Sequence, residues 1–217
     1  MSDASKSGVP RTYRVQELAR DLISISVRAP ALVAIWRGGR LPPALREQVV
    51  VAVAKVNACR MCEHAHTRMA LEAGVSNAEL AALESLDEDA FDRRTWLAIA
   101  HARERTKADF VRPAPDRNQE LLTQELGAQT YRDVEDVARV MTVANRIANV
   151  LNALSDRVRG NPVPGSRLLD ELIINILFLP AAWLGTLVAA ARQRKSPFVI
   201  WRQARQSEVA PGVGSRE

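Results

Sequence analysis

The chain has few of the residues that mark fibrous, disulfide-rich or disordered proteins. Its 217 residues include only 10 glycines, 11 prolines and two cysteines, and 47% of them are hydrophobic. So few glycines and prolines exclude a collagen-like chain, and the apolar fraction excludes a disordered one. Two cysteines in a chain this long cannot replace a hydrophobic core, which excludes a disulfide scaffold. A chain of this length buries roughly 70% of its unfolded surface, enough for a core of its own.

Lysine is scarce as well, and the excess of positive charge is local. The sequence has 30 basic and 25 acidic residues, a net charge of +5. One stretch, from Arg192 to Arg205, contains five bases and no acid, and these five charges equal the whole excess. The rest of the chain shows no set of aromatic residues on which nucleic-acid bases could stack. We therefore expect this stretch to be a solvated arginine-rich helix end, and we expect no nucleic-acid partner.

The N-terminal residues lack an apolar run. The segment MSDASKSGVPRTYR has no hydrophobic stretch, so we expect neither a secretory signal nor a lipidation site. We therefore expect a cytoplasmic protein. In a reducing compartment, closely spaced cysteines are more often redox or metal groups than structural bridges.

The hydrophobic pattern is helical along nearly the whole chain, and it shows no alternation typical of strands, which predicts an all-α fold. The run Val49–Val53 is β-branched, but the helical spacing of its apolar neighbours favours a helix. Prolines, glycines and a capping box at Ser76 mark where the individual helices of this pattern begin and end. Helices are expected over 12–37 with a break at Pro30, from 42 or 43 to 56, over 59–73, from 77, over 87–110, over 115–126 and over 130–159.

A linker is expected at residues 160–166, GNPVPGS, between a helical domain over 1–160 and a C-terminal helical extension over 161–217. Within the extension, residues 172–191 carry no charge and have the length of a membrane span. Asn175, Pro180 and Gly185 make this a weak span. We expect either that Pro180 divides this segment into two buried helices or that the segment covers an oligomer interface. Membrane contact through 167–205 is the less favoured interpretation.

Four residues form the most informative pattern. Cys59 and Cys62 are three apart and face the same side of a helix, and His66 lies one turn further along that side. A helix N-terminus favours a thiolate, and an imidazole can accept the thiol proton. A carboxylate could orient His66; the candidates are Glu47 on the preceding helix and Glu63 beside Cys62.

The cysteine pair has other possible interpretations. A c-type haem site needs histidine directly after the second cysteine, where Glu63 stands, and a thioredoxin-like site needs a preceding strand. A zinc site lacks the second ligand pair of structural zinc centres. Two packed core cysteines beside a surface histidine stay an alternative. Elsewhere, His101 is expected to be a surface or packed residue, and Trp96, Trp183 and Trp201 to be core or interface anchors.

This pattern resembles a known family. Glu47 followed by Cys59-x-x-Cys62-x-x-x-His66 is similar to the signature of the alkylhydroperoxidase D-like branch of the carboxymuconolactone decarboxylase family. The resemblance extends over about residues 14–155; the flanking features that agree with it are 41–43, Asn57, Gly74, Asn145, Arg146 and Asn149.

The resemblance implies an all-helical bundle that assembles as trimers or hexamers, with a hydroperoxide substrate and a dithiol reductant protein. It implies that Cys62 attacks peroxide, that Cys59 resolves the sulfenic acid to a disulfide, and that Glu47 and His66 relay protons. Helix-terminus reasoning alone favours Cys59 as the more exposed nucleophile, so the order stays open. Met61 stands where family members can carry a histidine between the cysteines, which removes a proton-transfer group.

The sequence therefore predicts a thiol-dependent peroxidase or disulfide reductase acting on organic hydroperoxides. A non-redox enzyme resembling the decarboxylases of the family is the second hypothesis, although proton abstraction beside a carbonyl needs no second thiol. A non-enzymatic helical oligomer with a membrane-associating tail is the third.

Overall fold

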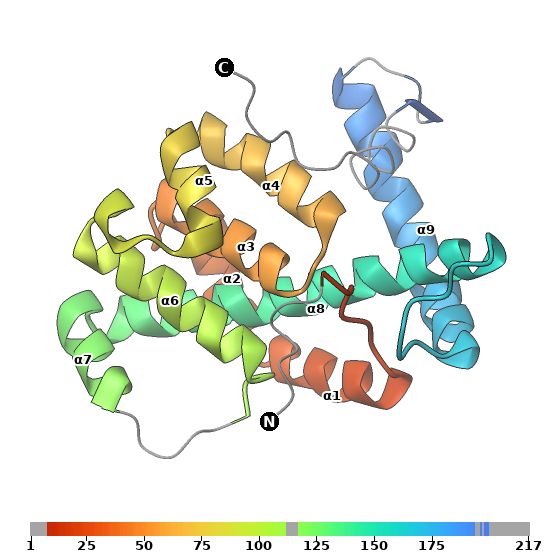
Figure 1. Cartoon of the computed structure of the whole chain (residues 1–217), viewed down its shortest axis with the longest axis horizontal. Coiled ribbons are helices and arrows are strands. Elements are labelled where there is room, and N and C mark those ends of the chain that lie inside the picture. Colours follow the sequence, from red (N-terminus) through yellow and green to blue (C-terminus); the bar gives the residue numbers. More distant parts are fainter. Residues whose placement is uncertain (1–7, 112–116, 194–195, 197, 200–217) are drawn as a thin grey trace.

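The computed structural model describes residues 8–111, 117–193, 196 and 198–199, and all secondary structure in these ranges is helical (Figure 1). A single 3-10 turn, η1, covers Glu88–Ala90. The all-α prediction is confirmed for this part of the chain. The α-helices are α1 (Val15–Ser26), α2 (Ala29–Trp36), α3 (Pro43–Val56), α4 (Arg60–Glu72), α5 (Asn77–Ser85), α6 (Arg93–Lys107), α7 (Arg117–Leu126), α8 (Ala128–Val158) and α9 (Leu168–Gln193).

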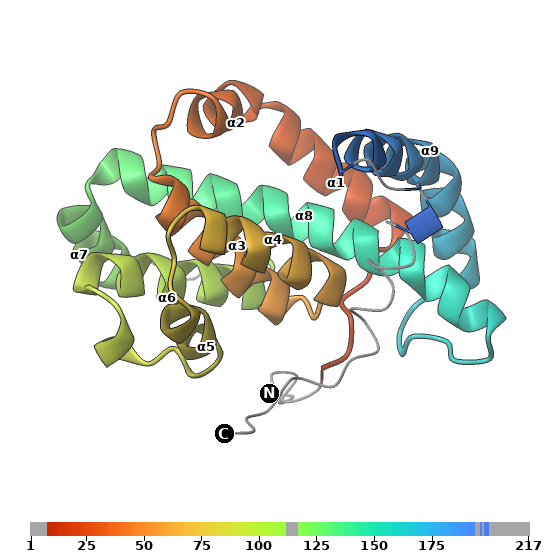
Figure 2. The same ribbon diagram turned by 90° about the horizontal axis from the view of Figure 1, so that it is seen from above.

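The long helix α8 is the centre of the molecule. In Figure 2, α3, α4 and α6 lie on one side of α8, and α2, α1 and α9 lie along the other. The larger core cluster joins α3, α6 and α8 through fully buried side chains such as Val50, Ile99 and Val134. A smaller cluster joins α1, α8 and α9 through Leu18, Val150 and Ile174. Thus α8 is covered by protein on two sides.

Helix α3 is the most deeply buried element. All residues from Glu47 to Ala54 are buried, including the valine run that could pass for a strand. The helix forms because contacts from α4, α6 and α8 cover it on several sides, so its β-branched residues need no sheet partner. The prediction of a helix over this run is confirmed.

The helix ends follow the local signals. Pro30 stands in the first turn of α2 and separates it from α1, and Pro43 begins α3. Ser76 accepts a hydrogen bond from the backbone N–H of Glu79, and the Glu79 side chain returns to Ser76, which completes the predicted capping box.

One predicted helix is divided in the structure. The segment expected as one helix over 87–110 contains η1 and then α6, which begins only after Asp92. The Asp92 carboxylate accepts hydrogen bonds from the backbone N–H groups of Arg94 and Thr95, and this cap fixes the start of α6. Trp96 of α6 is an anchor, as expected: its indole N–H donates to the Leu86 carbonyl oxygen at 3.1 Å.

The expectation of two buried helices divided by Pro180 was wrong on both counts. α9 runs unbroken from Leu168 to Gln193 with Pro180 inside it, and most of its large apolar side chains are exposed. Proline in a helix removes the hydrogen bond to the carbonyl four residues earlier. That residue is Ile176, which faces solvent, so the carbonyl is not trapped in a dry interior. Trp183 of α9 contacts the ring of Phe198, whereas Trp201 and most of the basic stretch 192–205 lie outside the described residues.

A half-buried ionic cluster joins α6 to α8. The Glu135 carboxylate lies 3.2 Å from Nε2 of His101, 3.1 Å from Nη2 of Arg105 and 3.3 Å from Nη2 of Arg139. His101 is packed against the ring of Tyr131, in line with its predicted packed role. Burial alone would raise the pKa of Glu135, but the hydrogen bonds and charges of His101 and Arg105 outweigh it and hold the pKa at about 2.

We expect Glu135→Gln to lower the free energy of unfolding at pH 7 by about 2–3 kcal/mol, since the depressed pKa means that the charged form stabilises the fold. This stabilisation is complete above the ordinary carboxyl pKa and is lost as pH falls toward 2, so the variant should show a flatter acid limb. Urea unfolding between pH 2 and pH 7 measures both effects.

Glu104→Gln is the matched control, because Glu104 pairs with Lys107 on the exposed side of α6. Its loss should stay below about 0.5 kcal/mol. Equal losses in the two variants would contradict a stabilising role for the half-buried cluster.

Candidate functional site

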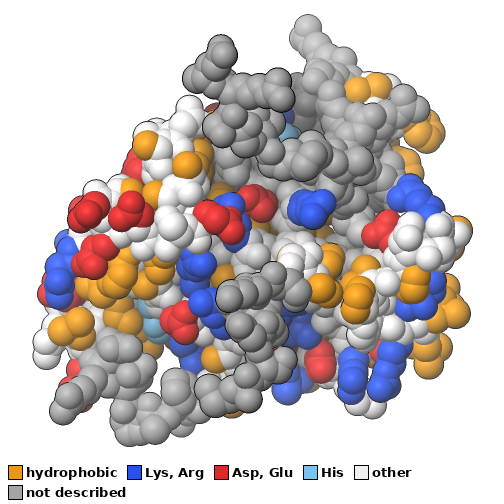
Figure 3. Space-filling model, viewed as in Figure 1, with side chains coloured by type: hydrophobic (Ala, Val, Ile, Leu, Met, Phe, Trp, Pro, Cys, Tyr) orange, Lys and Arg blue, Asp and Glu red, His pale blue; other side chains and the backbone are white. Residues whose placement is uncertain are grey.

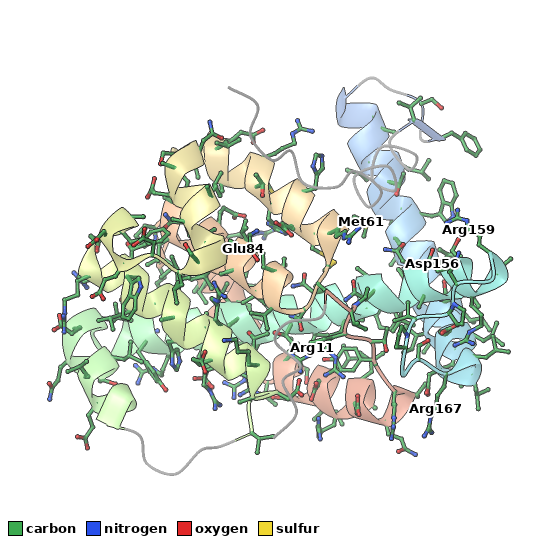
Figure 4. All side chains as sticks on the ribbon, viewed as in Figure 1. Arg11, Met61, Glu84, Asp156, Arg159 and Arg167 are labelled. Carbon is green, nitrogen blue, oxygen red and sulfur yellow. A yellow bond between two sulfur atoms is a disulfide. The ribbon has the colours of Figure 1, made fainter. Side chains whose placement is uncertain are left out.

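The two cysteines lie at the beginning of α4 and form a disulfide. Cys59 is the N-cap residue of α4 and Cys62 lies in its first turn, with 5.3 Å between their Cα atoms. This separation is within the range of disulfides in proteins. The predicted approach of the two thiols on one side of a helix is therefore present. In Figure 4 the disulfide is seen beside Met61, at the N-terminal end of α4.

The two sulfur-bearing residues differ in exposure. Cys59 is only 1% exposed, whereas Cys62 is half-buried and reaches the surface. The expectation from helix-terminus reasoning that Cys59 is the more exposed thiol was wrong, because Cys59 is almost fully buried in the folded chain. A substrate approaching from solvent therefore reaches Cys62 more easily than Cys59.

His66 is held by Glu47, the first of the two predicted carboxylates. Nδ1 of His66 lies 2.8 Å from Oε2 of Glu47, across the α3–α4 contact. Glu47 is 2% exposed and His66 is half-buried. A charged carboxylate only accepts hydrogen bonds, so Nδ1 carries the proton and Nε2 is the nitrogen that can exchange one.

Arg46 is a second partner of Glu47, and the sequence interpretation did not include it. Its Nε lies 3.1 Å from Oε1 of Glu47, and its guanidinium stacks 5.6 Å from the centre of the Trp36 ring. Burial alone would raise the pKa of Glu47, but the hydrogen bonds from His66 and Arg46 lower it below its ordinary value. Glu47 is therefore charged throughout the neutral range.

Glu63, the rival carboxylate, faces another partner. Its Oε1 lies 2.7 Å from Nζ of Lys55, which also binds Glu84 at 2.8 Å. Burial alone would lower the pKa of Lys55, and the hydrogen bonds with Glu63 and Glu84 raise it above its usual value. Glu63 thus joins α4 to α3 and α5. Of the two candidate carboxylates, Glu47 is the one that contacts His66.

The loop before Cys59 has a left-handed residue. Ala58 has φ of 50°, a conformation that costs a residue with a Cβ about 1–2 kcal/mol. It lies between the C-cap residue of α3, Asn57, and Cys59, whose backbone N–H donates to the Ala54 carbonyl oxygen at 2.9 Å. Strain at a sparsely populated conformation persists only where its surroundings fix it.

The surroundings of this loop are polar contacts with the N-terminal segment and α8. The Asn57 carbonyl oxygen accepts from the Arg11 backbone N–H at 3.1 Å and from Nδ2 of Asn149 at 2.8 Å. Asn149 also donates to the Arg11 carbonyl oxygen, and Arg11 reaches the Thr106 carbonyl oxygen at 2.7 Å. Arg11 is seen below the loop in Figure 4. The position of Cys59 thus depends on residues 48 and 90 positions away from it in the sequence.

Residues 29–104 match the family model described as the carboxymuconolactone decarboxylase family. This match agrees with the resemblance read from the Glu47, Cys59, Cys62 and His66 pattern. The searches of curated proteins and of solved structures found no match. The matched stretch runs from α2 through most of α6, and it contains both cysteines, His66, Glu47, Arg46 and Trp36.

We expect Ala58→Gly to raise the free energy of unfolding by about 0.5–1 kcal/mol, because glycine adopts a left-handed conformation without strain. The matched control is Ala65→Gly, at an exposed position inside α4, where glycine should lower it by about 1 kcal/mol. Chemical unfolding of both variants, with the disulfide intact, gives the comparison. Equal losses would show that Ala58 carries no strain.

Proposed function

We propose that this chain, whose residues 29–104 match the model of the carboxymuconolactone decarboxylase family, is a thiol-dependent peroxidase or disulfide reductase that acts through Cys59 and Cys62. The observation that carries the proposal is the disulfide at the start of α4 beside a His66–Glu47 pair. Organic hydroperoxides are the substrate class, and a dithiol protein is the reductant.

In the first step, Cys62 is the attacking group because it is the more exposed of the two cysteines. Its thiolate attacks the outer oxygen of the hydroperoxide, so that an S–O bond forms while the O–O bond breaks. Cys62 is oxidised to a sulfenic acid, and the alkoxide that leaves takes up a proton to become an alcohol.

In the second step, Cys59 attacks the sulfur of the Cys62 sulfenic acid. The S–S bond forms, the S–O bond breaks, and the oxygen leaves as water after accepting a proton. An external dithiol then reduces the disulfide and is itself oxidised to a disulfide. Acting as a disulfide reductase, the reduced pair would instead transfer two electrons and two protons to a disulfide substrate.

His66 and Glu47 are proposed to move the protons of both steps. His66 takes the proton from Cys62 and supplies one to the leaving oxygen, and Glu47 fixes its ring and its tautomer. Arg46 is a positioning residue, since it holds the second oxygen of Glu47. Met61 supplies no proton, so the relay depends on His66 alone among the residues of this motif.

The proposal predicts that Cys62→Ser abolishes dithiol-supported reduction of an alkyl hydroperoxide, because no thiolate remains to attack. Cys59→Ser should allow one stoichiometric reduction and leave Cys62 as a sulfenic acid, which a dimedone label detects by mass spectrometry. Thiol titration of the wild type, before and after hydroperoxide, should show the loss of two thiols per chain.

Unchanged turnover in Cys62→Ser would overturn the assigned roles. No thiol loss, together with no turnover of hydroperoxide or disulfide, would favour the non-redox alternative within the same family.

The proton relay gives a separate prediction. Glu47→Gln should lower peroxide turnover at neutral pH by at least about tenfold, because general acid–base groups contribute about 10²–10⁴-fold and their orientation depends on this carboxylate. Since the pKa of Glu47 lies below its ordinary value, the wild-type rate should show no titration of this group above about pH 5. Steady-state rates from pH 5 to pH 9 measure both.

Glu63→Gln is the matched control, since Glu63 lies on α4 with His66 but pairs with Lys55. Its rate and pH profile should equal those of the wild type. A tenfold loss in Glu63→Gln, with none in Glu47→Gln, would assign the relay to the other carboxylate.

A further inference from the structure

Asn145 of α8 is a fully buried polar residue whose side chain has no partner among the described residues. Its side chain is 0% exposed, and neither Oδ1 nor Nδ2 makes a hydrogen bond within the described ranges. Such an amide destabilises the fold, because each atom gives up its hydrogen bonds with water and gains none. The other buried asparagines, Asn57, Asn149 and Asn175, all have partners. Asn145 therefore needs an explanation other than stability.

The position of Asn145 on α8 directs it toward the loop between α3 and α4. Met141, four residues earlier, belongs to the core cluster that joins α3 to α8, and Asn145 lies on the same side of the helix one turn further along. Thr142 and Asn149 lie three residues before it and four residues after it, and both bind Asn57. Asn145 thus lies between two residues that contact this loop.

Cys59 is the residue of this loop whose side chain can become a partner of the amide. In Figures 1 and 2 the beginning of α4, where Cys59 is the N-cap residue, lies against α8. Cys59 is 1% exposed, so its sulfur is enclosed by protein as Asn145 is. Asn57 is already bound, since its Nδ2 donates to the Val53 carbonyl oxygen and its own carbonyl oxygen accepts from Asn149.

The redox state of Cys59 decides whether the amide gains a strong partner. A sulfur atom in a disulfide is a weak acceptor, whereas a thiolate carries a full negative charge and accepts charge-assisted hydrogen bonds. The structure holds the disulfide, the state in which Asn145 is unpartnered.

The surface of the protein offers such a thiolate little help. Acidic and basic side chains are mixed over the face formed by α4, α5 and α6 (Figure 3), so their fields largely cancel at a distance. Stabilisation of a buried thiolate therefore depends on groups next to it, such as the N-terminus of α4 and a donor on α8.

We propose that Nδ2 of Asn145 donates a hydrogen bond to the Cys59 thiolate when the pair is reduced, and so stabilises the reduced form against the disulfide. This inference rests on the proposed function only in taking Cys59 and Cys62 as a pair that cycles between dithiol and disulfide. Because the amide has no partner in the disulfide form, its whole contribution favours reduction.

The hydrogen bond acts in the step that resets the pair. A thiolate of the external dithiol attacks the sulfur of Cys62, the bond between Cys62 and Cys59 breaks, and the electron pair leaves with the Cys59 sulfur as a thiolate. Asn145 stabilises this leaving group as its charge develops. The second thiol of the reductant then displaces Cys62, so the reductant is oxidised to a disulfide and its two protons pass to the pair or to water.

The test is the redox equilibrium of Asn145→Leu, which replaces the amide by an apolar group of similar size. Full-length chains are equilibrated at pH 7 in buffers of reduced and oxidised dithiothreitol, and the free thiols are trapped and counted by mass spectrometry. Loss of a hydrogen bond to a charged sulfur should shift the equilibrium about tenfold toward the disulfide, which lowers the reduction potential by about 30 mV. The rate of reduction by dithiothreitol should fall at least about threefold, because the leaving thiolate is less stable.

Asn175→Leu is the matched control. Asn175 is a buried asparagine of α9 that donates to the carbonyl oxygens of Glu171 and Val150, in contact with neither cysteine. Its replacement should lower the free energy of unfolding and leave the potential and the reduction rate at the wild-type values. The oxidised Asn145→Leu chain should unfold at no lower urea concentration than the wild type, since it loses no hydrogen bond of the disulfide form.

Asn145→Ala removes the same donor and keeps the test decisive if the leucine variant does not fold, which circular dichroism shows. A more negative potential in either folded Asn145 variant, with an unchanged one in Asn175→Leu, supports the proposal. An unchanged potential in the Asn145 variants, or an equal shift in Asn175→Leu, overturns it. The assay contains no hydroperoxide, so its outcome is independent of whether the chain reduces peroxides.

Discussion

The buried carboxylate of Glu47 is the constraint on which the site depends. A charged carboxylate in a dry core costs several kcal/mol unless it is paired and hydrogen-bonded. Both its oxygens have partners: His66 of α4 binds one, and Arg46, the neighbour of Glu47 on α3, binds the other. Arg46 in turn stacks on Trp36 of α2. Loss of one partner would leave the other buried charge without full compensation. The pair therefore fixes how α4 packs on α3, and it places His66 one turn from Cys62.

The loop between these helices carries the second constraint, because Cys59 must lie at the N-terminus of α4 while Ala58 is left-handed. Residues outside the loop hold this geometry. The Asn57 carbonyl oxygen accepts hydrogen bonds from Arg11 of the N-terminal segment and from Asn149 of α8. The central helix therefore has two tasks. It supplies the apolar core through residues such as Val134 and Val137, and it holds the loop before Cys59 through Asn149, which lies further along the helix.

Much of this arrangement could be predicted from local patterns, and the rest could not for physical reasons. The approach of Cys59, Cys62 and His66 was predictable because helical spacing places them on one side of a helix, whereas spacing alone left Glu47 and Glu63 as rival partners of His66. The starts of α3 and α5 were predictable because Pro43 and Ser76 act within one turn. Arg11 and Asn149 leave no local signal, since their partners are distant in the sequence and any polar residue at those positions reads as solvated. The continuity of α9 through Pro180 depends on which side of the helix faces solvent, a tertiary property. The greater exposure of Cys62 likewise depends on the segment that covers Cys59.

The family match and the folded unit do not coincide, and the structure explains what the remainder contributes. The match over 29–104 contains every side chain of the candidate relay, but neither Arg11 nor α8. Without α8, the buried side of α3 would face water along its whole valine run, and the Asn57 carbonyl oxygen would lose its Asn149 donor. The strained loop before Cys59 would then keep only the contact of the Cys59 backbone N–H with the Ala54 carbonyl oxygen. The residues of the candidate site thus belong to the matched segment, whereas the support of the loop before Cys59 comes from the whole fold.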